Sequence, residues 1–114
     1  MYALKNKVQL IGNLGNAPEI KNTDTGKKVA RFSMATNESY KKENGERVTE
    51  TQWHNLVAWG KVAELAEQYL NKGSEIAIEG KLTHRDYTDK DGVKRYITEV
   101  VVNEILLLDK KPQA

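Results

Sequence analysis

The pattern of apolar and polar residues predicts β-strands for most of the chain. A β-rich run covers residues 8–11, and loose alternation of apolar and polar positions follows over residues 29–36. The alternation continues over residues 51–59, and β-rich sequence returns at residues 75–82 and 94–107. Five strands are therefore expected, separated by polar turns.

Alternation also assigns the side chains of each strand to two faces. The third run places Trp53 and Trp59 on one face and His54 on the opposite face, beside Leu56. The second run places three apolar residues on one face, namely Ala30, Phe32 and Met34.

One segment departs from the strand pattern and predicts a short helix over residues 61–70. Gly73 is expected to be the left-handed residue that ends this helix. Polar turns with glycine lie at residues 24–26, 42–46 and 89–92, between the expected strands. The apolar residues of the helix recur at spacings of three and four, at Val62, Leu65, Ala66 and Tyr69.

The order of three strands, one helix and two strands predicts an all-β fold. A five-stranded closed barrel of the oligonucleotide-binding (OB) type, with one short helix between strands 3 and 4, fits this order. A meandering sheet with a packed helix is the alternative. Gly12 and Gly80 lie inside strands and fit the tight bends that a small barrel needs.

Length and composition predict a single globular domain. The chain has 114 residues, 39% of them hydrophobic and none of them cysteine. A disulfide scaffold and a thiolate zinc site are therefore excluded, and no catalytic set, metal site or cofactor is expected. No apolar run approaches the roughly 20 residues of a membrane span, so a cytoplasmic, nucleoid-associated location is expected. The domain is assigned to residues 1–108, and residues 109–114 form a short tail.

Charge and aromatic residues together predict a binding surface. The formal net charge is only +2, so a site for a polyanion must be a local basic groove. Four aromatic residues have polar or basic neighbours, and this combination suits the flat bases and charged backbone of single-stranded nucleic acid. The competing interpretation is that they fill a small barrel with their polar tips in water. They are Tyr40, Trp53, Trp59 and Tyr87.

The sequence resembles the DNA-binding domain of the bacterial single-stranded DNA-binding protein family. The resemblance extends over nearly the whole chain, as a series of short blocks in the same order. These blocks are residues 6–15 (NKVQLIGNLG), 18–19 (PE), 29–36 (VARFSMAT), 51–54 (TQWH), 60–64 (GKVAE), 69–74 (YLNKGS), 79–82 (EGKL) and 95–100 (RYITEV).

The resemblance implies an OB barrel that forms a homotetramer and wraps single-stranded DNA. It implies that bases stack on Tyr40 after the second strand, on Trp53 within the third, on Trp59 at its end and on Tyr87 in the hairpin after the fourth. Tryptophan is more common in the family at the two tyrosines, and phenylalanine at Trp59. His54 matches a family histidine at a subunit contact.

The resulting prediction is a non-enzymatic protein that coats and protects single-stranded DNA in replication, recombination and repair. No element resembles a helix that reads the major groove, so little sequence preference is expected. Six cationic residues are expected to contact backbone phosphates: Lys7, Arg31, Lys61, Lys72, Arg85 and Arg95.

Two alternatives and one departure from the family accompany this prediction. The first alternative is a primosome-type assembly factor on the same barrel, which would bind DNA weakly. The second is a small hydrolase that uses Asp86, Asp89 and Asp91 around a divalent metal. The departure is the end of the sequence, residues 109–114, which lacks the acidic tip that recruits replication and repair proteins in the family, so such recruitment is not expected.

Overall fold

The computed structural model describes residues 5–108 and contains six strands and one helix in that range. The expected tail, residues 109–114, lies outside the described residues. In chain order the elements are β1 (Val8–Leu14), β2 (Glu19–Asn22), β3 (Lys28–Lys41), β4 (Arg47–Trp59), α1 (Lys61–Tyr69), β5 (Glu75–Thr88) and β6 (Lys94–Leu107). No helix within residues 5–108 has the length and apolar character needed to cross a membrane.

The strands close into a barrel. Their order in the sheet is β1-β5-β6-β4-β3-β2, and an additional pairing between β1 and β3 joins the two ends. The ring therefore contains β1, β3, β4, β5 and β6, with β4 and β6 running parallel and the other neighbours antiparallel. The expected five-stranded OB-type barrel is confirmed.

The helix was predicted to follow the third strand of the chain, but it follows the fourth, because the short strand β2 was not expected. β2 has four residues, of which only Ile20 is apolar, so its sequence carries little strand signal. It pairs with the first residues of β3, from Glu19 opposite Arg31 to Asn22 opposite Lys28. The helix consequently lies between β4 and β5, although it still separates the third and fourth strands of the barrel ring.

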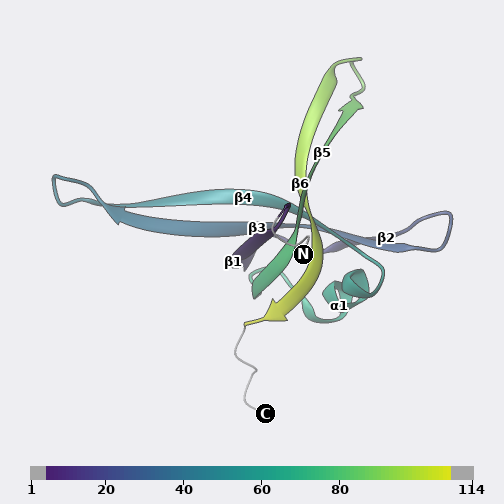
Figure 1. Ribbon diagram of the computed structural model, residues 1–114, viewed down its shortest axis with the longest axis horizontal. Coiled ribbons are helices and arrows are strands. Elements are labelled where there is room, and N and C mark those ends of the chain that lie inside the picture. Colours follow the sequence, from purple (N-terminus) through teal and green to yellow (C-terminus); the bar gives the residue numbers. More distant parts are fainter. Residues whose placement is uncertain (1–4, 109–114) are drawn as a thin grey trace, which may run out of the picture.

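Long hairpins project from the barrel. β3, β4, β5 and β6 each have 13 or 14 residues, and β3, β4 and β5 are longer than the predicted runs. The β3–β4 hairpin extends to one side and the β5–β6 hairpin extends in another direction (Figure 1). Gly45 and Gly92 have φ angles of 90° and 80° in the turns at the two tips, a conformation that suits glycine. The predicted turns at these positions are confirmed.

The core lies where the strands cross, and the predicted apolar faces point into it. The side chains of Met34, Leu56 and Ile76 are fully buried, and Phe32 and Ala30 lie beside them. The residues that follow on β3, from Asn37 onward, are exposed because the strand has left the barrel there.

The helix packs against the barrel through a stripe that overlaps the predicted one, because Val62 and Ala66 of that stripe contact the core, but that does not include Tyr69. Ala63 and Ala66 are buried, whereas Tyr69, expected in the apolar stripe, is exposed. An ion pair between Lys28 and Glu67 joins the start of β3 to the helix. The helix ends at an extended residue, Leu70, whose side chain is buried and takes the place expected for Tyr69.

The residue Gly73 does not cap the helix. It has a φ of 90° in the turn that follows, and its N–H donates to the carbonyl of Leu14 at 2.9 Å. This bond, with the N–H of Leu14 donating to the carbonyl of Ser74 at 2.9 Å, fixes the loop after the helix to the end of β1.

Barrel closure depends on two strand glycines. A Cβ atom on Gly12 would lie 2.1 Å from the carbonyl oxygen of Ala35 on β3, and one on Gly80 would lie 2.2 Å from that of Val101 on β6. The register of β5 with β6 also shifts between Glu79 and Gly80, which marks a bulge. Glycine is therefore required here because neighbouring backbones approach closely.

We expect Gly80→Ala to lower the free energy of unfolding by about 1–3 kcal/mol, because the new methyl group meets backbone atoms rather than a side chain that can rotate. Urea unfolding at a fixed protein concentration measures this loss. The matched control is Lys81→Ala on the next residue, whose side chain is exposed and whose change should stay within about 0.5 kcal/mol. Equal stability of the two variants would contradict the account of closure.

Candidate nucleic-acid interface

The register of β3 and β4 places an arginine between the two tryptophans. Trp53 lies opposite Ala35, and Arg31 lies opposite Val57, which is four residues after Trp53 and two before Trp59 along the strand. Because directly opposite residues and alternate residues share a face, both rings and the guanidinium project from the outer face of the same strand pair. The predicted common face of the tryptophans is confirmed by this register.

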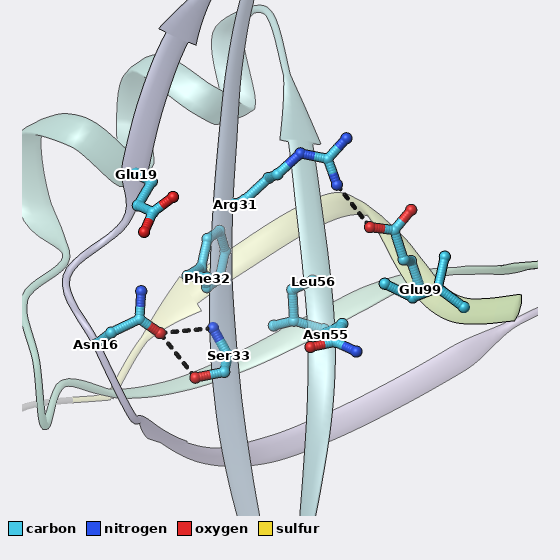
Figure 2. A pocket seen from close by; sticks show the side chains of 9 residues that line it. Asn16, Glu19, Arg31, Phe32, Ser33, Asn55, Leu56 and Glu99 are labelled. Carbon is cyan, nitrogen blue, oxygen red and sulfur yellow. Dashed lines mark hydrogen bonds and ion pairs between the residues drawn. The ribbon is translucent and has the colours of Figure 1, made fainter. Parts of the chain in front are cut away.

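The ring of Trp53 packs over Gly15, the residue that follows β1. A Cβ atom on Gly15 would come within 2.5 Å of Cζ3 of the Trp53 ring, so the ring lies directly over this glycine. Asn16 Oδ1 accepts hydrogen bonds from the backbone N–H of Ser33 at 3.0 Å and from its hydroxyl at 2.7 Å (Figure 2). Ser33 Oγ would also be 2.9 Å from the same Cβ, so Ser33 is a second close neighbour of Gly15.

The four predicted aromatic residues are exposed rather than part of the core. Trp53 is 62% exposed, Trp59 43%, and Tyr40 and Tyr87 47% each. A side chain that filled the barrel would be buried, as Phe32 is at 4%. The interpretation of these aromatics as barrel filling is therefore wrong.

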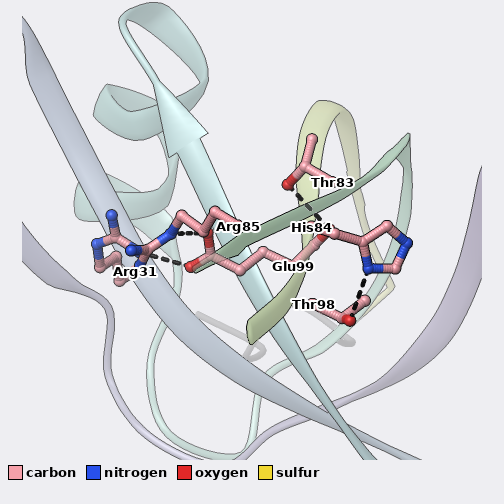
Figure 3. A network of polar contacts seen from close by, with 6 residues as sticks. All are labelled: Arg31, Thr83, His84, Arg85, Thr98 and Glu99. Atoms are coloured by element: carbon pink, nitrogen blue, oxygen red, sulfur yellow. Dashed lines mark hydrogen bonds and ion pairs between the residues drawn. The ribbon is translucent and has the colours of Figure 1, made fainter. Parts of the chain in front are cut away.

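A buried carboxylate joins arginines from two strands. Glu99 on β6 has a side chain only 7% exposed, whereas the side chains of Arg31 and Arg85 are 43% and 46% exposed. Arg31 Nη1 donates to Glu99 Oε2 at 2.6 Å, and Arg85 Nε donates to Glu99 Oε1 at 2.9 Å (Figure 3). Each carboxylate oxygen thus takes one arginine, and the triad has a net charge of +1.

The carboxyl group of Glu99 stays ionised to a lower pH than an ordinary glutamate does. Burial tends to raise the pKa of Glu99, but the hydrogen bond from Arg85 and the positive charges of Arg31 and Arg85 outweigh it and hold the pKa below its ordinary value. The same hydrogen bond and charge raise the pKa of Arg85. Glu99 therefore acts as a fixed negative charge between the arginines.

The outer face of the β5–β6 hairpin continues from this triad. Tyr87 lies directly opposite Arg95, and Arg85 is two residues before Tyr87, so all three share the face of Glu99. Arg95 Nε donates to Asp89 Oδ2 at 2.8 Å near the tip, and this bond and backbone N–H groups lower the pKa of Asp89. We call the surface formed by these residues the aromatic–arginine path; its members are Trp53, Trp59, Arg31, Glu99, Arg85, Tyr87 and Arg95.

Tyr40 does not share the face of Trp53. It lies within β3 rather than after it, opposite Val48, and strict alternation places it on the other face of the β3–β4 hairpin. Its hydroxyl donates to Glu50 Oε1 at 3.2 Å, and this hydrogen bond raises the pKa of the tyrosine. A single nucleic-acid strand that contacted both Tyr40 and Trp53 would have to follow the twist of the β3–β4 hairpin or pass around its edge.

The three predicted lysines have different surroundings. Lys61 follows Trp59 by two residues, and Lys72 lies in the loop that is hydrogen-bonded to the end of β1, near Gly15. Both are exposed and have no ion pair within residues 5–108. Lys7, by contrast, pairs with Glu79 at 3.2 Å beside the start of β1, at the opposite end of that strand from Gly15.

Two of the acids considered for a metal-dependent hydrolase form ion pairs or hydrogen bonds with other groups instead. Asp86 pairs with Lys94 at 3.4 Å, and Asp89 binds Arg95 and the backbone of its own turn. In the described range, 5–108, no three histidine or acidic side chains are arranged to hold a metal ion.

Sequence reasoning missed the residues that support the predicted site. Glu99 was not singled out, although a charged residue beside the apolar run 100–102 is a usable signal. Asn16, Ser33 and Gly15 carry no such signal, because their role depends on contacts made after the strands have paired.

A closed barrel with exposed aromatic rings and interleaved arginines is typical of proteins that bind single-stranded nucleic acid. The sequence matches the single-strand binding protein family over residues 5–108, and the chain belongs to that family.

Named relatives and a solved structure agree with this assignment. The single-stranded DNA-binding protein 1 of Chlorobaculum tepidum is 46% identical and aligns with 93% of this chain and 66% of its own length. The single-stranded DNA-binding protein of Xanthomonas axonopodis pv. citri is 45% identical over 90% of this chain and 57% of its own length. The chain thus spans 57–66% of the length of these relatives. A solved complex of Plasmodium falciparum SSB with single-stranded DNA has a TM-score of 0.82 and 34% identity, covering 91% of this chain and 95% of that one.

Proposed function

We propose that this protein binds single-stranded DNA without sequence preference and coats it during replication, recombination and repair. The observation that carries the proposal is the aromatic–arginine path, in which cations alternate with exposed rings over two strand pairs. The names of the relatives and the DNA in the related complex support it.

The chemistry of the path suits a flexible strand. Each exposed ring offers a face for one base, and such stacking is worth about 1–3 kcal/mol per base. Guanidinium N–H groups left free by the acids can donate to phosphate oxygens. Stacking does not distinguish one base from another strongly, because every base has a flat face. Weak sequence preference follows.

We expect single-stranded DNA to quench the tryptophan emission strongly, because Trp53 and Trp59 are exposed and stack against bases. Duplex DNA of the same length should quench far less, since its bases are already stacked on one another. Binding should also weaken with salt, with a log–log slope of about −0.7 for each phosphate neutralised. Equal quenching by the two forms, or a flat salt response, would contradict the proposal.

We expect Trp53→Ala to weaken binding more than Lys72→Ala. Trp53 is a supported platform in the path, and its loss should cost on the order of 1–3 kcal/mol, whereas an exposed lysine can be replaced by a neighbour. Fluorescence anisotropy of a labelled oligothymidine measures both, with circular dichroism as the check on folding. Equal losses, or a loss that only follows unfolding of Trp53→Ala, would make Trp53 a structural residue.

We further propose that the protein assembles as a homotetramer through the face that carries β1. Residues 8–12 of β1 pair with β5 on one edge, and among residues 5–108 no strand pairs with their other edge. Ile11 and Leu106 are 64% and 63% exposed beside a cavity of about 430 Å³ on this face. An open strand edge beside exposed apolar side chains is typical of a surface that pairs with another chain.

The position of His54 is consistent with a role in that assembly. Its Nε2 lies 2.9 Å from the hydroxyl of Thr36, and the ring is half-buried. Thr36 follows Ala35, whose carbonyl faces Gly12, so the pair lies where β3 diverges from β1.

We expect His54→Ala to shift the protein from a tetramer toward smaller species. His84→Ala is the matched control, because His84 Nδ1 makes an equivalent 2.9 Å contact with the hydroxyl of Thr98, but on the exposed β5–β6 hairpin. Multi-angle light scattering over a range of concentrations reports the mass of each variant. A wild-type monomer at micromolar concentration, or equal effects of the two substitutions, would argue against this role.

A further inference from the structure

We infer that Glu99 is a positioning residue for DNA binding: it holds Arg31 and Arg85 side by side so that both bind the same segment of the phosphate backbone. This inference rests on the proposed function and adds to it a residue that is negative and yet favours binding of a polyanion.

In this triad some N–H groups of the two arginines bind Glu99, and the others remain available to bind a phosphate. Glu99 is almost inaccessible to solvent, so a phosphate cannot approach its carboxylate from outside. It takes Nη1 from Arg31 and Nε from Arg85. A guanidinium has five N–H donors, so both arginines keep donors that point away from the carboxylate.

The arginines come from distant parts of the chain and would not otherwise stay together. Arg31 belongs to β3 and Arg85 to β5, and neither strand pairs with the other. Two guanidiniums repel each other, and each half-exposed side chain has many rotamers in water. The carboxylate between them removes the repulsion and fixes both, which lowers the entropy lost when a phosphate binds.

The surroundings of the triad define where the phosphate lies. A cavity of about 240 Å³ beside it is lined by Arg31 and Glu99 and also by Glu19 (Figure 2). The second carboxylate disfavours an anion inside the cavity. The phosphate is therefore expected at the rim, over the exposed sides of the guanidiniums and between the bases stacked on the flanking rings.

The substitution Glu99→Gln tests this role because general electrostatics and positioning predict opposite results. The variant is one unit more positive, so without positioning it should bind a polyanion at least as tightly. We expect it instead to bind an oligothymidine roughly tenfold more weakly, the effect of one lost charge-assisted contact. Its salt slope should also become shallower by about 0.7, equivalent to one phosphate.

The control is Asp24→Asn, an exposed aspartate in the turn between β2 and β3 with no ion pair within residues 5–108. It makes the same charge change away from the arginines and should bind as wild type or slightly more tightly. Binding of Glu99→Gln equal to or tighter than that of Asp24→Asn would overturn the inference. Failure of the wild type to bind the oligonucleotide would instead overturn the proposed function.

If Glu99→Gln does not fold by circular dichroism, Arg31→Lys and Arg85→Lys replace it. These variants keep the charge but remove the planar fork that bridges carboxylate and phosphate. If Glu99 holds the two arginines as a unit, each single substitution should weaken DNA binding nearly as much as the double substitution. Losses that add would show that the arginines act independently and would overturn the inference.

Discussion

Closure of the barrel through β1 is the constraint on which the rest of the structure depends. β1 must pair with β5 along most of its length and with β3 at its end. The contact of β1 with β3 requires backbones closer than a Cβ atom allows, which is why Gly12 lies there, and the contact of β5 with β6 makes the same demand at Gly80. Once these crossings are made, the register of every other strand pair in the ring is fixed.

The closed ring uses only part of each long strand, and the remainder forms the exposed surface. β4 shows this most directly: Leu56 and Ala58 are in the core, while Trp53 and Trp59 on the opposite face are exposed. The barrel therefore acts as a rigid base that holds aromatic rings in defined positions. The support of Trp53 by Gly15 extends this rigidity to the ring itself.

Individual ion pairs, rather than a large excess of positive charge, set the orientation of the arginines on this surface. With a net charge of only +2, the chain has nearly as many acids as bases, and Arg31, Arg85 and Arg95 are each bound to a carboxylate. These carboxylates are less exposed than the guanidiniums that they bind. The cations consequently face solvent in fixed orientations even though the whole surface is not strongly basic.

Local sequence patterns predicted the five strands of the barrel ring, their apolar faces and the hairpin turns, because alternation and turn chemistry act between residues close in the chain. The sequence also identified the exposed aromatics through their polar neighbours and the strand glycines through their position. It did not predict β2, the outward direction of Tyr69, or the position of Tyr40 on the opposite face of the β3–β4 hairpin from Trp53. Those features depend on which strands meet and in what register. The link between Arg31 and Glu99 joins residues 68 positions apart, so only the tertiary structure could bring them together.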